Sequence, residues 1–208
     1  MTKILIVDDH AMIRTGLRQV CAALSPGASI LEADGAQSAL ALQKSEQPRL
    51  TILDLNMPGV SGLELLRQLL QSDANARVLV FSMHGEPLYA AKALEIGARG
   101  YLSKNASPEE LRTALSRILA GSTYVEAEIA QHLVAHPGEQ RQKLSDRDLE
   151  ILRLLGDGRS FTQIAQHLGL GYKTVANTAT AIKSKLGVAR TADLIRLSVE
   201  MGIGRQPL

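Results

Sequence analysis

The sequence predicts two folded parts: an α/β domain with a doubly wound, five-stranded parallel sheet, and a small all-α domain that contains a helix-turn-helix. Two observations predict this division. In the first 122 residues, short apolar runs alternate with amphipathic stretches, which is typical of βαβ units. From residue 143 onward, helical patterns separated by glycines recur without a strand-like run. A chain of 208 residues allows one large domain or two small ones.

The strands are predicted from apolar runs. Residues 4–7, 50–53 and 78–81 are nearly continuous apolar runs, and such runs fit strands that are buried on both faces of a parallel sheet. Residues 29–31 and 101–102 are weaker candidates that complete the five strands. Between the strands, apolar residues recur every three or four positions from Met12, Leu63 and Leu111 onward, and this spacing is the helical period.

The pattern changes after residue 122. Residues 126–135 fit a short helix, and the polar segment 136–142 has an adjacent proline and glycine, which is typical of a linker. Helical patterns then follow at 146–155, 161–168, 172–186 and 191–201. We therefore expect one domain at 1–122, a linker with a short helix at 123–142, and a second domain at 143–208.

Composition excludes several classes of protein. Aromatic residues make up only 3% of the chain, which argues against domains that stack bases on aromatic platforms. The single cysteine, Cys21, excludes an intramolecular disulfide and a multi-cysteine zinc site. No apolar run approaches the length of a membrane helix, and the N-terminus lacks the features of a signal peptide. We expect a cytoplasmic protein without a membrane partner.

Polar residues follow four of the five predicted strands. Asp8 and Asp9 follow the first strand, and Asp54 follows the third. Ser82 follows the fourth strand, and Lys104 follows the fifth. The carboxyl ends of parallel strands meet at one edge of an open sheet, so these side chains are expected to lie together. Crowded carboxylates repel one another, and a hard cation, usually Mg²⁺, relieves that repulsion. A hydroxyl and an ammonium group beside them suit a phosphoryl group that a carboxylate attacks.

Each of these residues also has an ordinary structural interpretation. An aspartate after a strand is most often a helix cap or a turn former. A single lysine is usually solvated, and a single serine is usually a turn residue. The placement of all five at strand ends of one sheet favours a functional site.

Four segments carry a resemblance to the receiver domain of two-component response regulators: residues 7–10, 53–59, 81–84 and 100–104. The resemblance spans about 120 residues. It implies that Asp54 is the phosphoacceptor and that a sensor histidine kinase is the donor. It also implies a Mg²⁺ site formed by Asp8, Asp9, Asp54 and the backbone carbonyl of Asn56. Ser82 and Lys104 would contact the phosphoryl group, and Tyr101 would be the aromatic switch residue that turns inward.

Phosphatases of the haloacid dehalogenase type are the rival class. They also attack with an aspartate at a strand end, but they need a second aspartate two positions later as general acid. That position is Asn56 here, and an amide is not a useful acid or base near pH 7. Their nucleophile also lies near the start of the chain, whereas Asp54 follows the third strand. We therefore disfavour a dedicated enzyme.

The C-terminal part contains a predicted helix-turn-helix. Residues 161–168 form the first helix, Gly169-Leu170-Gly171 the turn, and residues 174–186 the second helix, which is placed to enter the major groove of DNA. Lysines suit phosphates, asparagine suits adenine, and threonine suits a base edge or a thymine methyl. The candidate DNA contacts are Lys173, Thr174, Asn177, Thr178, Thr180, Lys183 and Lys185.

With residues 144–152, Gly158 and residues 185–188, this part is similar to the LuxR-type DNA-binding domain. A receiver followed by this domain is the architecture of NarL/FixJ-type response regulators. The chain departs from the common pattern at Ala176, where the family usually has lysine, and at Thr178, where histidine is common. These departures leave undetermined whether the chain makes the family's usual phosphate contacts and which DNA sequence it recognises.

The last predicted helix has two interpretations. In the family, this helix pairs two DNA-binding domains, which makes Leu194, Leu197, Ser198 and Met201 candidates for dimerisation. The alternative is that its apolar residues only close the core of their own domain.

The combined expectation is a transcription regulator that is switched by phosphorylation, with promoter DNA and a second copy of the chain as partners. The alternative keeps the receiver but gives the helical part a role in protein–protein contacts. Salt-dependent binding to promoter-sized DNA distinguishes the two, because a protein-interaction domain shows none.

Overall fold

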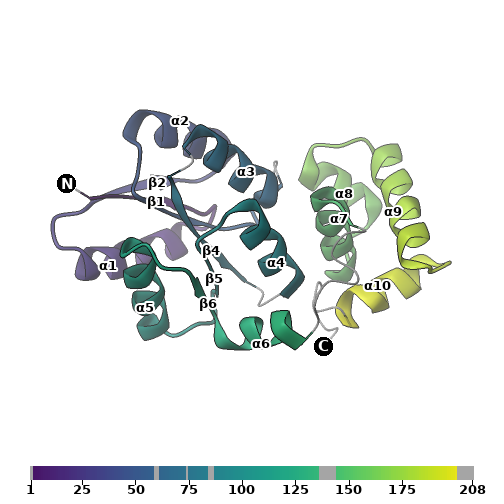
Figure 1. Ribbon diagram of the computed structural model, residues 1–208. Coiled ribbons are helices and arrows are strands. Elements are labelled where there is room, and N and C mark those ends of the chain that lie inside the picture. Colours follow the sequence, from purple (N-terminus) through teal and green to yellow (C-terminus); the bar gives the residue numbers. More distant parts are fainter. Residues whose placement is uncertain (1, 59–60, 74, 84–86, 136–143, 201–208) are drawn as a thin grey trace. The chain divides into compact units, whose positions relative to one another are not determined.

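A computed structural model describes residues 2–58, 61–73, 75–83, 87–135 and 144–200 (Figure 1). The chain divides into two compact units: Met1–Gly85 with Ala93–Glu128, and Glu86–Lys92 with Ile129–Leu208. The division at Glu128 falls inside the predicted linker, and the predicted domain limits stay a prediction.

The first unit is built on a parallel sheet whose strand order is β2-β1-β3-β4-β5-β6. The first five strands have the flavodoxin-like order, in which strands are added first on one side of β1 and then on the other. The strand order therefore reverses at the β1/β3 boundary, and ligands bind there, outside the carboxyl ends of the strands. The strands are β1 (Lys3–Val7), β2 (Ser29–Ala33), β3 (Leu50–Leu53), β4 (Arg77–Ser82), β5 (Gly100–Ser103) and β6 (Tyr124–Val125).

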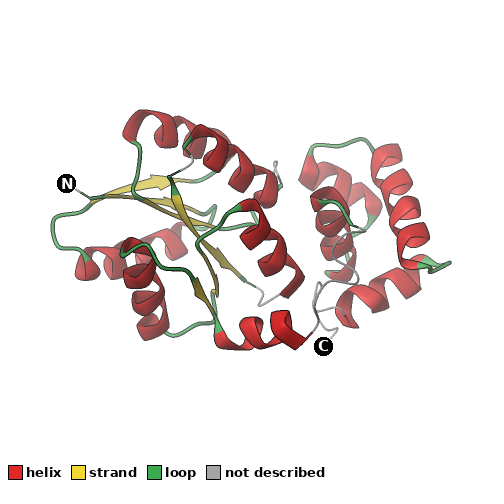
Figure 2. Ribbon diagram, in the orientation of Figure 1, coloured by secondary structure: helices red, strands yellow, loops and turns green. Residues whose placement is uncertain are grey.

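Helices connect the first five strands and the last of them leads to β6. They are α1 (Ala11–Leu24), α2 (Ala36–Glu46), α3 (Gly62–Ser72), α4 (Pro87–Ile96) and α5 (Pro108–Leu119). Helices α1 and α5 cover one face of the sheet, while α2 and α3 cover the other (Figures 1 and 2). This double covering explains why β1, β3 and β4 read as continuous apolar runs in the sequence.

The sixth strand corrects the predicted count of five. Strand β6 lies in the segment that we expected to be a linker, and it pairs in parallel with Gly100 and Tyr101 of β5. It is only two residues long, so it leaves no periodicity in the sequence. Gly100 permits the pairing, because a Cβ at this position would lie 2.7 Å from the backbone oxygen of Tyr124.

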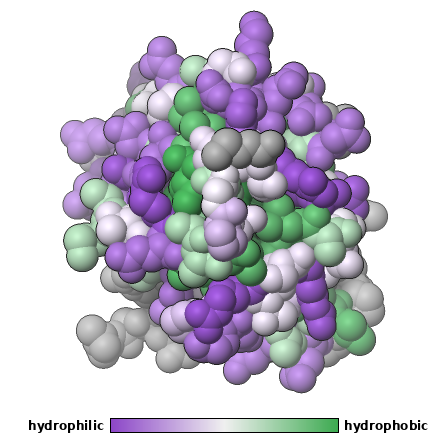
Figure 3. Space-filling model, turned by 90° about the vertical axis from the view of Figure 1, so that its left-hand side faces the viewer, coloured by the Kyte–Doolittle hydropathy of each residue, from purple (hydrophilic) through white to green (hydrophobic). Residues whose placement is uncertain are grey.

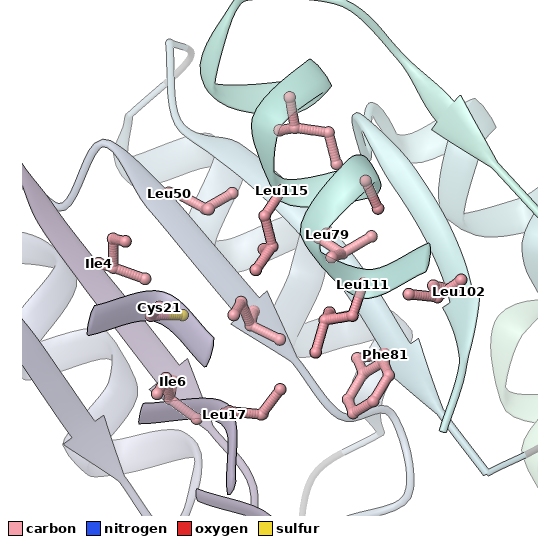
Figure 4. Close-up of a cluster of buried hydrophobic side chains, with 13 residues drawn as sticks. Ile4, Ile6, Leu17, Cys21, Leu50, Leu79, Phe81, Leu102, Leu111 and Leu115 are labelled. Carbon is pink, nitrogen blue, oxygen red and sulfur yellow. The ribbon is translucent and has the colours of Figure 1, made fainter. Parts of the chain in front are cut away.

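A buried apolar cluster joins the sheet to α1 and α5. Leu17 and Cys21 of α1 and Leu111 and Leu115 of α5 point toward the strand residues between them (Figure 4). The strand side chains of the cluster come from β1, β3, β4 and β5 and include Ile4, Ile6, Leu50, Ile52, Leu79, Phe81 and Leu102. The surface at the left of Figure 1 is mostly hydrophilic, with a band of hydrophobic residues through its centre (Figure 3).

The second unit is helical. Its helices are α6 (Ala127–Ala135), which begins at the end of the first unit, α7 (Asp146–Gly156), α8 (Phe161–Leu168), α9 (Tyr172–Leu186) and α10 (Thr191–Glu200). Helix α7 packs against α8, α9 and α10. In the part of the chain that the structure describes, no helix combines the length and the apolar character needed to cross a membrane.

Local sequence signals fix the limits of these helices. Ser145 and Asp148 form a capping box at the start of α7, and Ser160 and Gln163 form one at the start of α8. Helices α8 and α9 end at glycines with positive φ angles, Gly169 (63°) and Gly187 (70°). The predicted ranges 161–168 and 172–186 are therefore confirmed.

Candidate functional site

Two buried aspartates share one buried lysine at the carboxyl edge of the sheet. Asp8 follows β1 and Asp54 follows β3, and each side chain is only 1% exposed. The ammonium nitrogen of Lys104, which follows β5, lies 2.5 Å from Oδ2 of Asp8 and 2.7 Å from Oδ2 of Asp54. The strand ends thus bring these three predicted residues together.

Backbone groups orient the two carboxylates. Oδ1 of Asp54 accepts a hydrogen bond from the backbone N–H of Asn56 (3.0 Å), and Oδ1 of Asp8 accepts one from that of His10 (2.8 Å). Each carboxylate therefore directs one oxygen to its own loop and the other to Lys104. The loop after β3 is also held by Gly62, because a Cβ there would lie 2.4 Å from backbone atoms of Leu55.

The charges of this cluster are set by burial and by pairing. Burial raises the pKa of Asp54, and the Lys104 ammonium opposes that rise. Burial by itself would lower the pKa of Lys104, but the Asp54 and Asp8 carboxylates outweigh it and raise the pKa. Lys104 is therefore a fixed positive charge, and it neutralises part of the negative charge that surrounds it.

A metal ion could be held beside this pair. Ligand atoms of Asp8, Asp9, His10 and Asp54 all lie within 4.8 Å of one another. Carboxylate oxygens are the ligands that hard divalent cations prefer. The side chains of Asp9 and His10 are 30% and 62% exposed, so the group opens to solvent on one side. His10 was missing from the predicted set, although it directly follows Asp8-Asp9 in the sequence.

The predicted switch residues lie on the neighbouring strands. Ser82 ends β4, is 4% exposed, and its Oγ accepts a hydrogen bond from the side-chain amide of Asn56 (3.1 Å). Its backbone carbonyl accepts one from the N–H of Lys104 (2.7 Å). Tyr101 lies on β5 and is already buried, at 1% exposure. The contact between Asn56 and Ser82 was not predicted, because no sequence signal specifies a side-chain amide pairing across two loops.

Helix α9 presents one buried and one exposed face. Val175, Ala179 and Ile182 are buried against the rest of the helical unit. Of the predicted DNA contacts, Lys173, Thr174, Asn177, Thr180 and Lys185 are exposed, and Thr178 and Lys183 are partly buried. The ammonium of Lys185 pairs with the Asp148 carboxylate of α7. Burial raises the pKa of Asp148, but hydrogen bonds from Lys185 and Ser145 outweigh it and the pKa is lowered.

Helix α10 contributes mainly to the core of its own unit. Leu194 and Ser198 are 0% exposed, and the Ser198 hydroxyl donates to the backbone oxygen of Ile195 (2.6 Å). Leu197 is partly buried, and Met201 lies outside the described residues. Burial thus favours the core interpretation for Leu194 and Ser198. Among the candidates for dimerisation that the structure describes, Leu197 is the one with an accessible side chain.

Two family models match the chain. The model of the response regulator receiver domain matches residues 4–116, and the model of bacterial regulatory proteins of the luxR family matches residues 142–198. Together they cover both structural units.

Relatives match over nearly the whole length. The chain is 41% identical to the transcriptional activator protein ExaE of Pseudomonas putida over 209 aligned positions, which cover 97% of this chain and 98% of that protein. It is 31% identical to the response regulator GacA of Pseudomonas aeruginosa, with 98% of each chain covered.

Solved structures show the same fold. A LuxR-family two-component response regulator from Aurantimonas sp. SI85-9A1 is 38% identical, with a TM-score of 0.61 over 65% of this chain and 97% of that one. RcsB from Salmonella enterica serovar Typhimurium, solved on promoter rprA with BeF3-, has a TM-score of 0.72 at 22% identity and covers 94% of this chain and 96% of its own. At that identity the second likeness concerns the fold alone.

Proposed function

The chain belongs to the NarL/FixJ-type response regulators, which join a receiver domain to a LuxR-type DNA-binding domain, and on this premise we propose that Asp54 is the residue whose phosphorylation controls it. The protein is a transcription regulator switched by phosphorylation. The observation that supports Asp54 is its buried pairing with Lys104, next to Asp8.

The phosphoryl donor is a phosphohistidine of a sensor kinase. An oxygen of the Asp54 carboxylate attacks the phosphorus, the P–N bond breaks, and the imidazole takes the leaving electron pair. The N–H of Asn56 keeps one oxygen of Asp54 in place during this step, since it already bonds Oδ1. Asp8, Asp9, Asp54 and the carbonyl of Asn56 would hold Mg²⁺, which would neutralise charge at the phosphoryl oxygens.

Lys104 then changes partner. Before phosphorylation its ammonium contacts Oδ2 of both aspartates. A phosphoryl group on Asp54 offers the ammonium an oxygen of greater negative charge. Ser82 donates its hydroxyl proton to another phosphoryl oxygen, and that proton is not used by the present contact, in which Oγ accepts from the amide of Asn56. Tyr101, on the same strand that leads to Lys104, transmits the change.

The output is binding to promoter DNA as a homodimer, in the cytoplasm, where the chromosome lies. Helix α9 is the recognition helix, and its exposed residues contact the major groove. The match to the luxR family favours DNA over the alternative of an output through protein–protein contacts.

The test uses the full chain with Mg²⁺ and acetyl phosphate as a small donor. Intact-mass spectrometry should show one added phosphoryl group on the wild type and none on Asp54→Asn. Asp34→Asn is the matched control, because Asp34 follows β2 but is exposed and lies outside the acidic group. Acetyl phosphate should raise the affinity for promoter DNA in the wild type and in Asp34→Asn only. Phosphorylation of Asp54→Asn at the wild-type level would refute the assignment.

A further inference from the structure

The composition of helix α9 restricts what it can recognise. Its sequence, YKTVANTATAIKSKL, contains no arginine, aspartate, glutamate or glutamine. Arginine or lysine makes the commonest specific contact to guanine, and carboxylates accept from the amino group of cytosine. Among strong base readers, the helix therefore retains three lysines and one asparagine, the residue that pairs with adenine through two hydrogen bonds.

The face opposite the buried stripe consists of small side chains. Asn177, Thr180, Ala181 and Ser184 are exposed on it, and Lys173 lies on the same face in the first turn. Small side chains allow a helix to approach the floor of the groove closely, where the methyl groups of thymine lie.

The hydroxyls of Thr178 and Thr180 are already engaged within this helix. The hydroxyl of Thr178 donates to the backbone oxygen of Thr174 (2.9 Å), and that of Thr180 donates to the backbone oxygen of Ala176 (3.0 Å). Each of these two hydroxyls thus donates its proton to a backbone oxygen of the same helix. What Thr180 offers to a partner is its methyl group and the lone pairs of an oxygen.

Two of the three lysines, Lys183 and Lys185, are not free at the centre of this face. Lys185 is held by Asp148, and Lys183 is partly buried beside the core stripe. Lys173 is exposed at the end of the helix, where a flexible ammonium group suits a phosphate. Beyond Lys173, the face carries the amide of Asn177, the hydroxyl of Ser184 and the methyl groups of Thr180 and Ala181.

We infer that this face is specific for A·T base pairs: Asn177 hydrogen-bonds adenine, and the methyl groups of Thr180 and Ala181 pack against the C5-methyl groups of thymine. The inference rests on the proposed function, because it presupposes that α9 enters the major groove. It adds the class of sequence that the helix selects.

The first experiment selects binding sites. Full-length protein, treated with acetyl phosphate and Mg²⁺, is incubated with duplexes that carry a randomised core, and the bound fraction is sequenced. The same selection is carried out with Asn177→Ala. We expect the wild type to select A·T pairs at the positions where Asn177→Ala shows no preference, and we expect this variant to bind about tenfold more weakly. Selection of G·C pairs at those positions would overturn the inference and leave the proposed function intact. A bound fraction without any sequence preference would contradict the proposed function itself.

The second experiment removes single methyl groups from both partners. In the selected duplex, each thymine is replaced in turn by deoxyuridine, which lacks only the C5-methyl group. At one position this change should weaken the wild type about fourfold, the equivalent of about 0.8 kcal/mol for one methyl group. Thr180→Ser, which keeps the hydroxyl and loses the methyl, should bind the thymine duplex about fourfold more weakly and should be insensitive to that deoxyuridine.

The matched control is Thr180→Val, which keeps a methyl in place and loses the hydroxyl. Since that hydroxyl bonds only the helix backbone, Thr180→Val should bind within about twofold of the wild type and retain the response to deoxyuridine. Equal responses of wild type and Thr180→Ser to every deoxyuridine would overturn the methyl contact, as would a Thr180→Val variant that loses as much affinity as Thr180→Ser.

Discussion

At the scale of single residues, the acidic site depends on the imbalance between two buried carboxylates and one buried ammonium group. Asp8, Asp54 and Lys104 are nearly inaccessible, so their mutual attraction is screened little by water. One lysine cannot neutralise both carboxylates as well as Asp9. The residual negative charge favours a cation.

Residue-level prediction from the sequence succeeded where strand topology decides position. Asp8, Asp54, Ser82 and Lys104 were placed at one edge because parallel strands end there. The hydrogen bond from Asn56 to Ser82 and the approach of His10 to the two aspartates were not predicted. Both depend on side-chain rotamers in loops, and no pattern of spacing determines those.

Cys21 gives a prediction at this scale. It lies 0% exposed in the cluster between α1 and the sheet, and burial raises the pKa of its thiol to about 12 (Figure 4). Because the thiolate is the reactive form, Cys21 should be unreactive toward an aromatic disulfide reagent at pH 8. In denaturant the same thiol should react rapidly, which is the control. Native-state labelling at the denatured rate would contradict the burial.

At the scale of elements, β6 pairs with β5 and lies at the start of the connection to the second unit. The N–H of Tyr124 donates to the carbonyl of Arg99 (3.0 Å), and the N–H of Glu126 donates to that of Tyr101 (3.2 Å). The Glu126 carboxylate accepts from the N–H of Ser103 (2.8 Å), one residue before Lys104. The start of the connection between the units is therefore hydrogen-bonded along the strand that carries Tyr101.

Most elements were predictable because burial and capping leave patterns in the sequence. The strands covered on both faces read as apolar runs, and α7, α8 and α9 carry serine caps or terminal glycines. Helix α2, with the sequence AQSALALQKSE, shows no clear apolar stripe, and no helical repeat was named for it from the sequence. Strand β6 was missed because its two residues are held by pairing with β5, a tertiary effect.

The side chain of Glu126 is testable through the amide that it holds. Glu126→Ala removes the acceptor of the Ser103 N–H, so the domain should lose about 1 kcal/mol of stability and that amide should exchange faster with solvent. Glu126→Gln is the matched control, because its amide oxygen can still accept the bond. Hydrogen exchange followed by NMR measures both. Unchanged protection of Ser103 in Glu126→Ala would show that the carboxylate does not hold this strand.

At the scale of the whole molecule, the near-neutral charge is the sum of unlike parts. Residues 1–122 carry 12 basic and 12 acidic residues, residues 123–142 carry 1 and 3, and residues 143–208 carry 10 and 6. Some basic residues of the last part are paired internally, as Arg153 with Glu150, Lys185 with Asp148 and Arg190 with Asp193, and these pairs leave its small net basic excess unchanged. One copy of the chain therefore attracts DNA only modestly, and two copies on one site double the attraction.

The salt dependence of DNA binding tests this balance. Each phosphate contact adds about 0.9 to the slope of log affinity against log salt concentration. Lys173→Gln should therefore reduce the slope by about 0.9 if one copy binds and by about 1.8 if a dimer binds. Lys44→Gln is the charge-matched control on α2, exposed but in the receiver, and it should leave the slope unchanged. Fluorescence anisotropy of labelled duplex across a salt series measures the slopes. An unaltered slope in Lys173→Gln would remove Lys173 from the phosphate contacts, whereas a change near 1.8 would show that phosphorylated protein meets its DNA as two copies.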